Sequence, residues 1–405
     1  MILIESLTIT EGNVSGVVNR ENLTLHAVEV TNNTKVLGTG GGINHAAGRL
    51  VVSNSTLTGN RAKQGAAIEV DRGGTAEIVN STISGNTASG GGGGIVVTTT
   101  GKVEIRNSTI TNNRSQVNGD LVGPGGGIWS TASSVTLHNT IVAGNFRGTA
   151  DTTSDLAGPV NSTSSHNLIG NFTVSGGLAH GDNGNILGDG GTAVLPISRI
   201  LNTTLSDNGG PTRTHVLVFG SPAINAGDDA AAIDVNRIPL ATDQRGGAFS
   251  RLLDGVGNGH TTVDMGAIET SPITGDVDGD TDFDANDSFL IHLVKLPGSD
   301  AQLDQSKGST SLTVAQLRTN ISQLGSLADV DGDGDFDAND SFLIHIIKLS
   351  GTNTQIEQSK GGSSLTAAQI RTNINALDAQ ATTSASTPPE SQVLQSVTPV
   401  FQKRT

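Results

Sequence analysis

The chain has 405 residues, enough for more than one domain, and its formal net charge of −15 argues against nucleic acid or an anionic membrane surface as a partner. Aromatic residues make up 2% of the sequence, so aliphatic side chains must fill the core. The absence of cysteine excludes disulfides and thiolate metal sites, and no apolar run is long enough for a transmembrane helix. The first residues lack a basic segment and a long apolar segment, so no signal peptide is visible.

The first half of the chain is an internal repeat. The segments VVSNSTLTGN (51–60), EIVNSTISGN (77–86) and EIRNSTITNN (104–113) share one pattern. With one earlier and one later copy, the closing asparagines are Asn33, Asn60, Asn86, Asn113 and Asn145. Their steps are 27, 26, 27 and 32 residues, with alternating Val, Ile, Leu and Thr between Gly and Asn. This pattern predicts one coil of a parallel β-helix per period, with two or three short strands in each coil.

Stacked coils place each residue above its equivalent in the preceding coil, about 4.8 Å away. We therefore expect the closing asparagines to form an amide ladder along the axis. Asn54, Asn80 and Asn107 open Asn-Ser-Thr triplets that match the glycosylation acceptor pattern, but their constant phase in the repeat favours a stacked turn. His26 and His138 also share one phase, which favours a ladder position over catalysis.

Glycine-rich blocks such as Gly40-Gly41-Gly42-Ile43, together with the I/L-x-x-N pattern, resemble the repeats of bacterial right-handed β-helix surface proteins, including the polymorphic outer-membrane family. Five later motifs occur in a fixed order. They are HNLIGN (166–171), DNGGPTRTH (207–215), GSPAINAGD (220–228), DQRG (243–246) and VDMGAIE (263–269). This series is similar to the closing region of the bacterial proteins called choice-of-anchor Q. The resemblance implies a right-handed parallel β-helix and, because a fold does not define a function, little about a ligand.

Polysaccharide lyases and glycoside hydrolases also use the β-helix fold. Glycoside hydrolysis requires two carboxyl groups at a defined separation, and Asp228-Asp229 is the one adjacent acidic pair before residue 270. His260 in GNGHTT lacks the second glycine and the basic partner found in β-helix pectin hydrolases. Trp129 is interpreted as a solvent-side or end-cap aromatic. The sequence favours a β-helix without catalytic residues, and the enzyme is kept as the alternative.

The most specific motif is duplicated. DVDGDTDFDAND (276–287) and DVDGDGDFDAND (329–340) each hold six aspartates and continue into SFLIH. The aspartates fall where an EF-hand loop places its oxygen ligands for Ca²⁺, a hard cation that takes about six to eight oxygens. We predict two calcium sites with the candidate ligands Asp276, Asp278, Asp280, Asp282, Asp284, Asp287, Asp329, Asp331, Asp333, Asp335, Asp337 and Asp340. Because the clustered carboxylates repel one another, folding is expected to be coupled to metal binding.

Capping boxes that begin at Thr313 and Thr366 predict helices over about 313–325 and 366–377. The predicted order is a loop and two helices, repeated once. The first loop then lacks an entering helix, and we expect the helix over 366–377 to pack there.

The sixth loop position requires a sharp turn, for which glycine is used. This position is Gly334 in the second loop and Thr281 in the first. A β-branched residue is strained at positive φ, so we expect weaker calcium binding at the first loop. His292 and His345, on the helices that follow the loops, are interpreted as packed or exposed helix residues and not as ligands.

The duplicated loop and helix resemble type I dockerins, which also use aspartate at the last loop position. The resemblance implies a calcium-dependent docking module that binds a cohesin-like or other surface protein. Dockerins recognise cohesin partly through a Ser-Thr pair, and the equivalent positions here are Ala285-Asn286 and Ala338-Asn339. This departure weighs against cohesin itself as the partner.

We therefore expect β-helix repeats over 1–205, a closing segment over 206–270, a dockerin-like module over 271–379 and a disordered Ser/Thr/Pro-rich tail over 380–405. The expected function is adhesion, display or attachment by an extracellular or bacterial cell-surface protein. Its expected cofactor is Ca²⁺, and its expected partners are a surface protein and a polysaccharide. The alternative is a secreted polysaccharide lyase or glycoside hydrolase docked through the same module.

Overall fold

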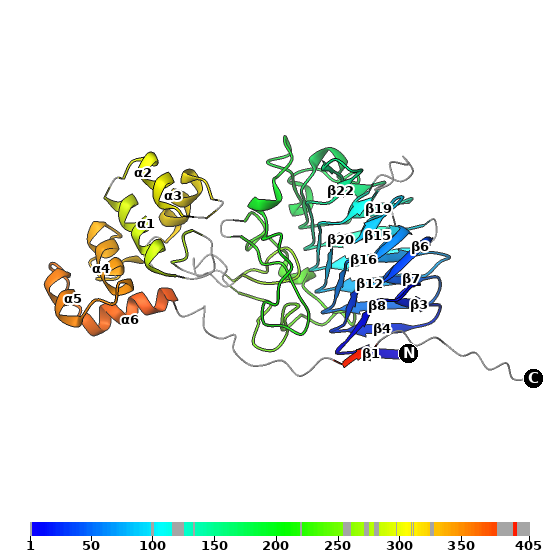
Figure 1. Cartoon of the computed structure of the whole chain (residues 1–405), viewed down its shortest axis with the longest axis horizontal. Helices are drawn as coiled ribbons and strands as arrows, with labels where there is room; N and C mark the ends of the chain where they lie inside the picture. The colour runs from blue at the N-terminus through cyan, green and yellow to red at the C-terminus, as the bar shows by residue number, and fades with distance from the viewer. Residues whose placement is uncertain are drawn as a thin grey trace, which may run out of the picture. The chain divides into compact units, whose positions relative to one another are not determined.

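The computed structural model describes residues 2–98, 101–115, 125–132, 134–218, 221–253, 261–270, 275–278, 283–296, 298–308, 310, 312–324, 328–378 and 392–394. These residues form two compact units, which Figure 1 draws as a stack of strands and a group of helices. The first unit contains the described residues up to Leu253, together with Thr261–Thr270 and 392–394. The second contains those between residues 275 and 378.

The first unit is a parallel β-helix. Its strands are short because asparagine and glycine turns interrupt the alternating apolar runs every few residues. Apart from an antiparallel hairpin at 146–153, the described strands pair in parallel with their equivalents in the neighbouring coils, and the stack is seen from the side in Figure 1. The isoleucine after each glycine-rich block forms an inward, buried row of Ile43, Ile68, Ile95 and Ile128. The predicted fold class, mainly β with a helical C-terminal part, is confirmed.

The described strands belong to four sheets. The first contains β1 (Ile2–Glu5), β4 (Leu23–His26), β8 (Arg49–Ser53), β12 (Thr75–Val79), β16 (Lys102–Arg106) and β20 (Val135–His138). The second contains β2 (Leu7–Thr10), β5 (Glu29–Thr31), β9 (Thr56–Thr58), β13 (Thr82–Ser84), β17 (Thr109–Thr111), β21 (Ile141–Val142), β25 (Leu168–Ile169), β26 (Ile186–Leu187) and β27 (Gln392–Leu394). The third contains β3 (Val17–Asn19), β7 (Ile43–His45), β11 (Ile68–Val70), β15 (Ile95–Val97), β19 (Ile128–Ser130) and β24 (Leu156–Ala157). The fourth contains β6 (Thr34–Thr39), β10 (Arg61–Gln64), β14 (Thr87–Ala88), β18 (Arg114–Ser115), β22 (Phe146–Arg147) and β23 (Thr152–Thr153).

A complete coil has four strands, which corrects the expected two or three. The additional strand follows the closing asparagine, as in β10. Arg61 and Lys63 of β10 are exposed, and Ala62 packs in a small separate cluster with Ala66 and Ala88. A polar strand with one small inward residue gives no alternating hydrophobic signal, so sequence reasoning missed it.

The predicted asparagine ladder is present and buried. Each side-chain amide donates to the amide oxygen of the next coil at 2.9–3.0 Å, along Asn33, Asn60, Asn86, Asn113 and Asn145. The last of these amides donates to the carboxylate of Asp155. The side-chain amides therefore all donate in the same direction, and the ladder ends on a group that accepts hydrogen bonds.

The stacked-turn interpretation of the Asn-Ser-Thr triplets is confirmed. Asn54, Asn80 and Asn107 have φ angles of 49°, 46° and 47°, a left-handed conformation that asparagine tolerates well. Asn80 and Asn107 are also buried, so their side chains are inaccessible to a modifying enzyme. His26 and His138 lie at one register position, where each ring contacts a serine hydroxyl of the next coil.

The closing segment packs against the β-helix through its sequence motifs. Gln244 of DQRG donates to Thr56 Oγ1 at 2.9 Å and accepts from Thr82 Oγ1 at 2.6 Å. Arg251 forms a buried ion pair with Glu269 of VDMGAIE, with 3.1 Å between Nε and Oε1. Short 3₁₀ turns lie before the closing segment, at η1 (Phe172–Val174), η2 (Asp182–Gly184) and η3 (Ile197–Arg199), and within it, at η4 (Asp229–Ala231).

The second unit consists of two similar halves, each a loop followed by three helices. The first half contains α1 (Ala285–Lys295), α2 (Asp300–Ser306) and α3 (Val314–Gln323). The second contains α4 (Ala338–Lys348), α5 (Asn353–Ser359) and α6 (Ala367–Asp378). One aliphatic core, with Leu290, Leu317, Leu343 and Ile370 among its fully buried members, joins the two halves.

Two expectations about these helices were wrong. Helices α2 and α5 were not predicted, because each is short and buries a single apolar side chain, Leu303 or Ile356. The helix over 366–377 does not complete the first loop as proposed. Asn373 of α6 donates to the carbonyl of Val330 in the second loop, as Asn320 of α3 donates to the carbonyl of Val277 in the first. Each loop is therefore supported by the third helix of its own half.

The tail expected to be disordered over 380–405 lies outside the described residues, apart from β27. This strand pairs in parallel with β2, with Gln392 opposite Leu7 and Leu394 opposite Ile9.

Candidate metal centre

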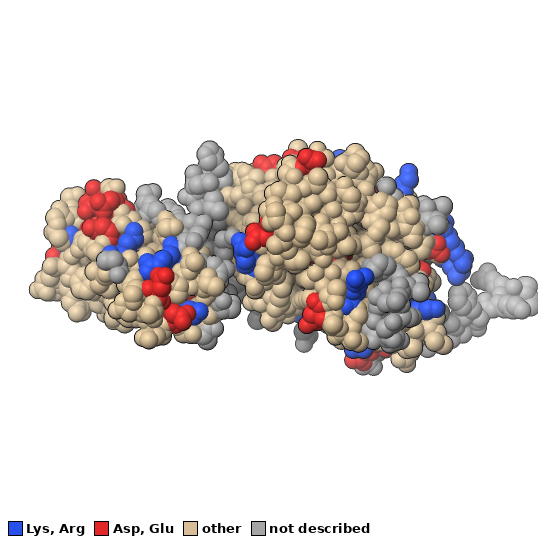
Figure 2. Space-filling model, turned by 90° about the horizontal axis from the view of Figure 1, so that it is seen from above, with Lys and Arg blue, Asp and Glu red and all other residues tan. Residues whose placement is uncertain are grey.

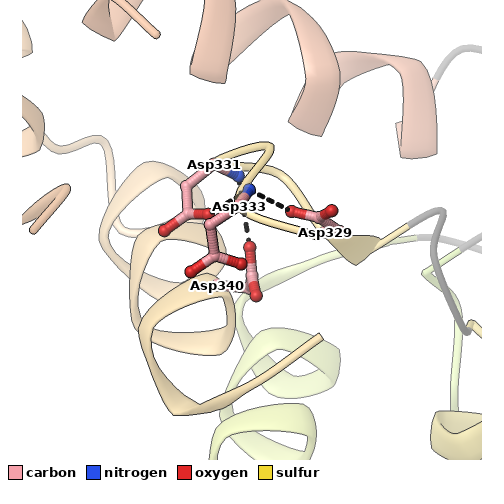
Figure 3. A group of neighbouring side chains, drawn as sticks. All are labelled: Asp329, Asp331, Asp333 and Asp340. Atoms are coloured by element: carbon pink, nitrogen blue, oxygen red, sulfur yellow. Dashed lines mark hydrogen bonds between the residues drawn. The ribbon is translucent and has the colours of Figure 1, made fainter. Parts of the chain in front are cut away.

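Four carboxylates of the second aspartate loop converge around the first turn of α4 (Figure 3). One oxygen from each of Asp329, Asp331, Asp333 and Asp340 lies within 4.8 Å of the others. Oxygens bound to one Ca²⁺ at about 2.3–2.6 Å are at most about 5 Å apart. The spacing of these carboxylates therefore fits a shared calcium ion. A second overlapping group joins Asp340 to Asp335 and Asp337.

The start of α4 fixes the orientation of Asp340. Asp337 is the N-cap of α4, and its backbone N–H donates to Asp340 Oδ2 at 2.9 Å in a capping box. The N–H of Val330 donates to Asp340 Oδ1 at 2.8 Å, so this fully buried carboxylate also holds the beginning of the loop. One side chain thus joins both ends of the loop to the helix.

The middle of the second loop turns around the carboxylate of Asp329. This carboxylate accepts the N–H groups of Gly332 at 2.8 Å and of Gly334 at 3.0 Å. Gly334 has a φ of 105°, a conformation that side-chain-bearing residues rarely adopt. The predicted need for glycine at the sixth position is therefore confirmed in this loop. Thr281, its counterpart, lies outside the described residues.

The first loop repeats the same arrangement where it is described. Carboxylate oxygens of Asp276, Asp278 and Asp287 lie within 4.8 Å of one another, and all three side chains are buried. Asp287 accepts the N–H of Val277 at 2.8 Å, and Asp284 is the N-cap of α1. The predicted ligands Asp280 and Asp282 lie outside the described residues.

Burial and like charges raise the pKa of one helix-borne aspartate in each loop. Desolvation, with the charges of Asp276 and Asp278, raises the pKa of Asp287 to about 8. Desolvation, with the charge of Asp331, raises the pKa of Asp340 to about 6. Figure 2 shows a dense acidic patch on the helical unit. A divalent cation would relieve both causes at once, so the donor set fits Ca²⁺.

Several residues that position these loops were not recognised from the sequence. The side-chain amides of Asn286 and Asn339, which the dockerin comparison assigned to partner recognition, donate to the carboxylates of Asp278 and Asp331. The segment RTNI occurs at 318–321 and again at 371–374, and its asparagines are the loop supports in α3 and α6. This repeat was the available sequence signal.

The histidines of α1 and α4 contact each other and hydroxyl groups. The rings of His292 and His345 are parallel, with centroids 5.9 Å apart. Their Nδ1 atoms lie 3.1 Å from Ser341 Oγ and 3.0 Å from Ser288 Oγ. Among the described residues, neither histidine belongs to a group that could hold a metal ion.

The β-helix places its candidate catalytic residues in structural roles. Asp228 caps η4 by accepting the N–H of Ala230 at 3.0 Å, and Asp229 accepts the N–H of Val263 at 2.9 Å. His260 lies outside the described residues. Trp129 is half-buried in β19, where its register partner one coil later is Ala157.

A cleft of about 630 Å³ lies beside the last coils. It is bounded by the hairpin of β22 and β23 and by the η1 turn, and Arg147 is the charged residue among its described lining residues. Thr152, Thr173 and Ser175 also line it. Arg114 stabilises the hairpin through Asp151, with 2.5 Å between Nη2 and Oδ1.

No protein-family model, curated protein or solved structure matches this chain. Within the described residues, the helices are too short and too polar to cross a lipid bilayer.

Proposed function

We propose that this chain is a calcium-binding β-helix protein of the bacterial cell surface or extracellular space, and that its helical unit is a docking module of the dockerin type. The observation that carries the proposal is the pair of aspartate loops. In each loop, carboxylates from the start of the loop meet the aspartate at the third position of the following helix. Calcium at the millimolar concentrations outside cells would occupy sites of this kind.

The surface of the helical unit supports docking. Phe289 and Leu296 on the first half are 38% and 52% exposed, and their counterparts Phe342 and Leu349 are 42% and 60% exposed. Because these apolar side chains are exposed at equivalent positions of the two halves, they would offer a partner two equivalent apolar contacts. The proposed partner is a cohesin-like or other surface protein, and the β-helix would act as a rigid element for adhesion or display.

Calcium titration of the intact, chelator-treated chain tests the proposal. Isothermal titration calorimetry should find two bound ions per chain, and far-UV circular dichroism should report an increase in helical signal that saturates with calcium. Magnesium at the same concentration is the control, because it requires a stricter octahedral geometry. A chain that keeps its full helical signal in chelator and takes up no calcium would contradict the proposal.

A second proposed activity is binding of an acidic polysaccharide in the cleft of the β-helix. The supporting observation is a cleft lined by Arg147 together with threonine and serine residues, a combination that suits a uronate carboxylate and its neighbouring hydroxyl groups. Arg147→Met should abolish retention on an immobilised polyuronate, whereas Arg199→Met, at a surface ion pair with Asp189, should not. Equal retention of both variants would exclude this cleft. Chain shortening of the polyuronate would instead favour the enzyme alternative.

A further inference from the structure

The two calcium loops are connected by a reciprocal contact between lysine and phenylalanine. Lys295, the last residue of α1, donates its ammonium to the carbonyl of Phe336 in the second loop at 2.5 Å. Lys348, the last residue of α4, donates to the carbonyl of Phe283 in the first loop. Each ammonium also lies over the ring of the same phenylalanine, 3.4 Å from the Phe336 centroid and 3.7 Å from the Phe283 centroid.

The contacted peptide is next to a predicted calcium ligand. Phe336 follows Asp335, the loop position that gives its backbone carbonyl to the ion in an EF-hand loop. A cation that fixes the Phe336 carbonyl therefore restricts the rotation of the neighbouring peptide. Each lysine makes both a charge-assisted hydrogen bond and a cation–π contact with the same phenylalanine, and the two interactions reinforce each other.

Each lysine is distant from the loop of its own half. Asp287 lies in the first turn of α1, and Lys295 is eight residues later, about 12 Å along the helix axis. Burial lowers the pKa of Lys295, while Asp340, Asp337 and Asp335 of the opposite loop oppose this effect. The charge of Lys295 therefore acts on the second loop, although its helix begins in the first.

Helices α1 and α4 are also joined between these two contacts. The rings of His292 on α1 and His345 on α4 stack on each other, and each ring contacts a serine of the opposite helix. Phe289 lies against the ring of His345, with centroids 5.8 Å apart. A shift of α1 caused by ordering of the first loop would therefore move Lys295 relative to the second loop.

We propose that Lys295 and Lys348 are positioning residues of the opposite calcium loops, and that through them the two loops bind calcium with positive cooperativity. This inference rests on the proposed calcium function. Its basis is that α1 and α4 each start in one loop, and that the lysine at the end of each of these two helices donates to a carbonyl of the other loop.

The experiment measures each loop separately in the intact chain by calorimetric calcium titration. Asp276→Asn with Asp278→Asn disables the first loop, and Asp329→Asn with Asp331→Asn disables the second. Lys295→Met keeps the length of the side chain and removes its charge. It should weaken calcium binding at the second loop by about tenfold and leave the first loop nearly unchanged. Lys348→Met should have the mirror-image effect, and Lys295→Arg should restore most of the affinity.

Lys360→Met is the matched control, because Lys360 donates to the carbonyl of Leu365 within its own half. It should leave the ratio of the two affinities unchanged. In the chain with both loops intact, Lys295→Met should also reduce the cooperativity of binding. Weakening of the first loop by Lys295→Met, or no effect at either loop, would overturn the inference while calcium binding itself stands. A wild-type chain that binds no calcium would instead remove the proposed function and this inference with it.

Discussion

Asn145 donates its side-chain amide to Asp155 Oδ1 at 3.0 Å, and this bond ends the asparagine ladder of the β-helix. The same oxygen accepts the backbone N–H of Asn145 at 3.0 Å, and Oδ2 accepts the N–H of Asn171 at 2.8 Å. Asp155 is buried, and it supplies the acceptor for the last amide of a ladder in which all side-chain amides donate in one direction. The last amide needs a partner that accepts hydrogen bonds and donates none.

Asp155→Asn should therefore destabilise the β-helix. The substituted amide places an N–H₂ group against either Asn145 or Asn171, so at least one buried donor loses its acceptor. The expected loss is about 1–3 kcal/mol of unfolding free energy, measured by urea unfolding followed through Trp129 fluorescence. Asp151→Asn is the control, because Asp151 is 76% exposed and its ion pair with Arg114 contributes less than about 1 kcal/mol. Equal stability of the two variants would contradict this role of Asp155.

Proton binding by Asp155 should make the stability of the β-helix depend on pH. Burial raises the pKa of Asp155 to about 6, compared with about 3.9 in an unfolded chain. The folded state then binds the proton more tightly, so the stabilisation that comes from proton binding is present below about pH 4 and is lost as the pH rises to about 6. Relative to Asp155→Asn, the wild-type chain should lose unfolding free energy over this window. A difference between the two chains that stays constant with pH would refute the assignment.

The repeat of the β-helix could be predicted because stacking imposes one chemical role on each phase of the sequence. Inward isoleucines, closing asparagines and left-handed turn asparagines each recur at a constant phase. The fourth strand of each coil could not be predicted, because its side chains are mostly half-buried or exposed and carry no hydrophobic alternation. The partner of the last asparagine was also invisible, since Asp155 is an isolated aspartate in the sequence.

The aspartate loops were predicted from spacing alone, and the structure brings Asp329, Asp331, Asp333 and Asp340 together. The packing of helices around the loops was predicted wrongly. An analogy with a paired EF-hand suggested that the last helix crosses to the first loop, whereas short helices, α2 and α5, return the chain to its own loop in each half. These short helices begin with capping boxes at Ser299 and Thr352, a signal that the absence of apolar periodicity obscured.

Asn320 and Asn373 make equivalent hydrogen bonds to the first and second loops, so their substitutions can be compared directly. Asn373→Ala removes the donor to the Val330 carbonyl, 3.0 Å away, and should weaken calcium binding at the second loop. Asn320→Ala removes the donor to the Val277 carbonyl, 2.8 Å away, and should weaken the first loop. Loss of one such hydrogen bond is expected to change each affinity by about fivefold to tenfold. The single-loop chains described above measure both effects, and a crossed effect would restore the earlier packing hypothesis.

At the sixth loop position, glycine can be removed from the second loop and introduced into the first. Gly334→Ala should weaken calcium binding at the second loop, because φ is 105° at this position. An added Cβ would meet no atom within 4 Å, so backbone strain is the expected cause. The strain is about 1–2 kcal/mol, or about a tenfold loss of affinity. Thr281→Gly should tighten the first loop by a similar factor. Calcium titration checks both variants, and unchanged affinities would show that this position is not strained.

Protonation should make the first loop the more pH-sensitive calcium site. With a pKa of about 8, Asp287 holds a proton at neutral pH in the metal-free chain, whereas Asp340, with a pKa of about 6, has largely lost it. Calcium must displace the proton of Asp287, so affinity at the first loop should fall as the pH decreases below about 8, and at the second loop below about 6. Calorimetry at pH 7 in two buffers of different ionisation enthalpy measures the protons released. Release should approach one proton when the first loop is filled alone and be much smaller for the second. Equal release from both loops would show that the burial of Asp287 is lost before calcium binds.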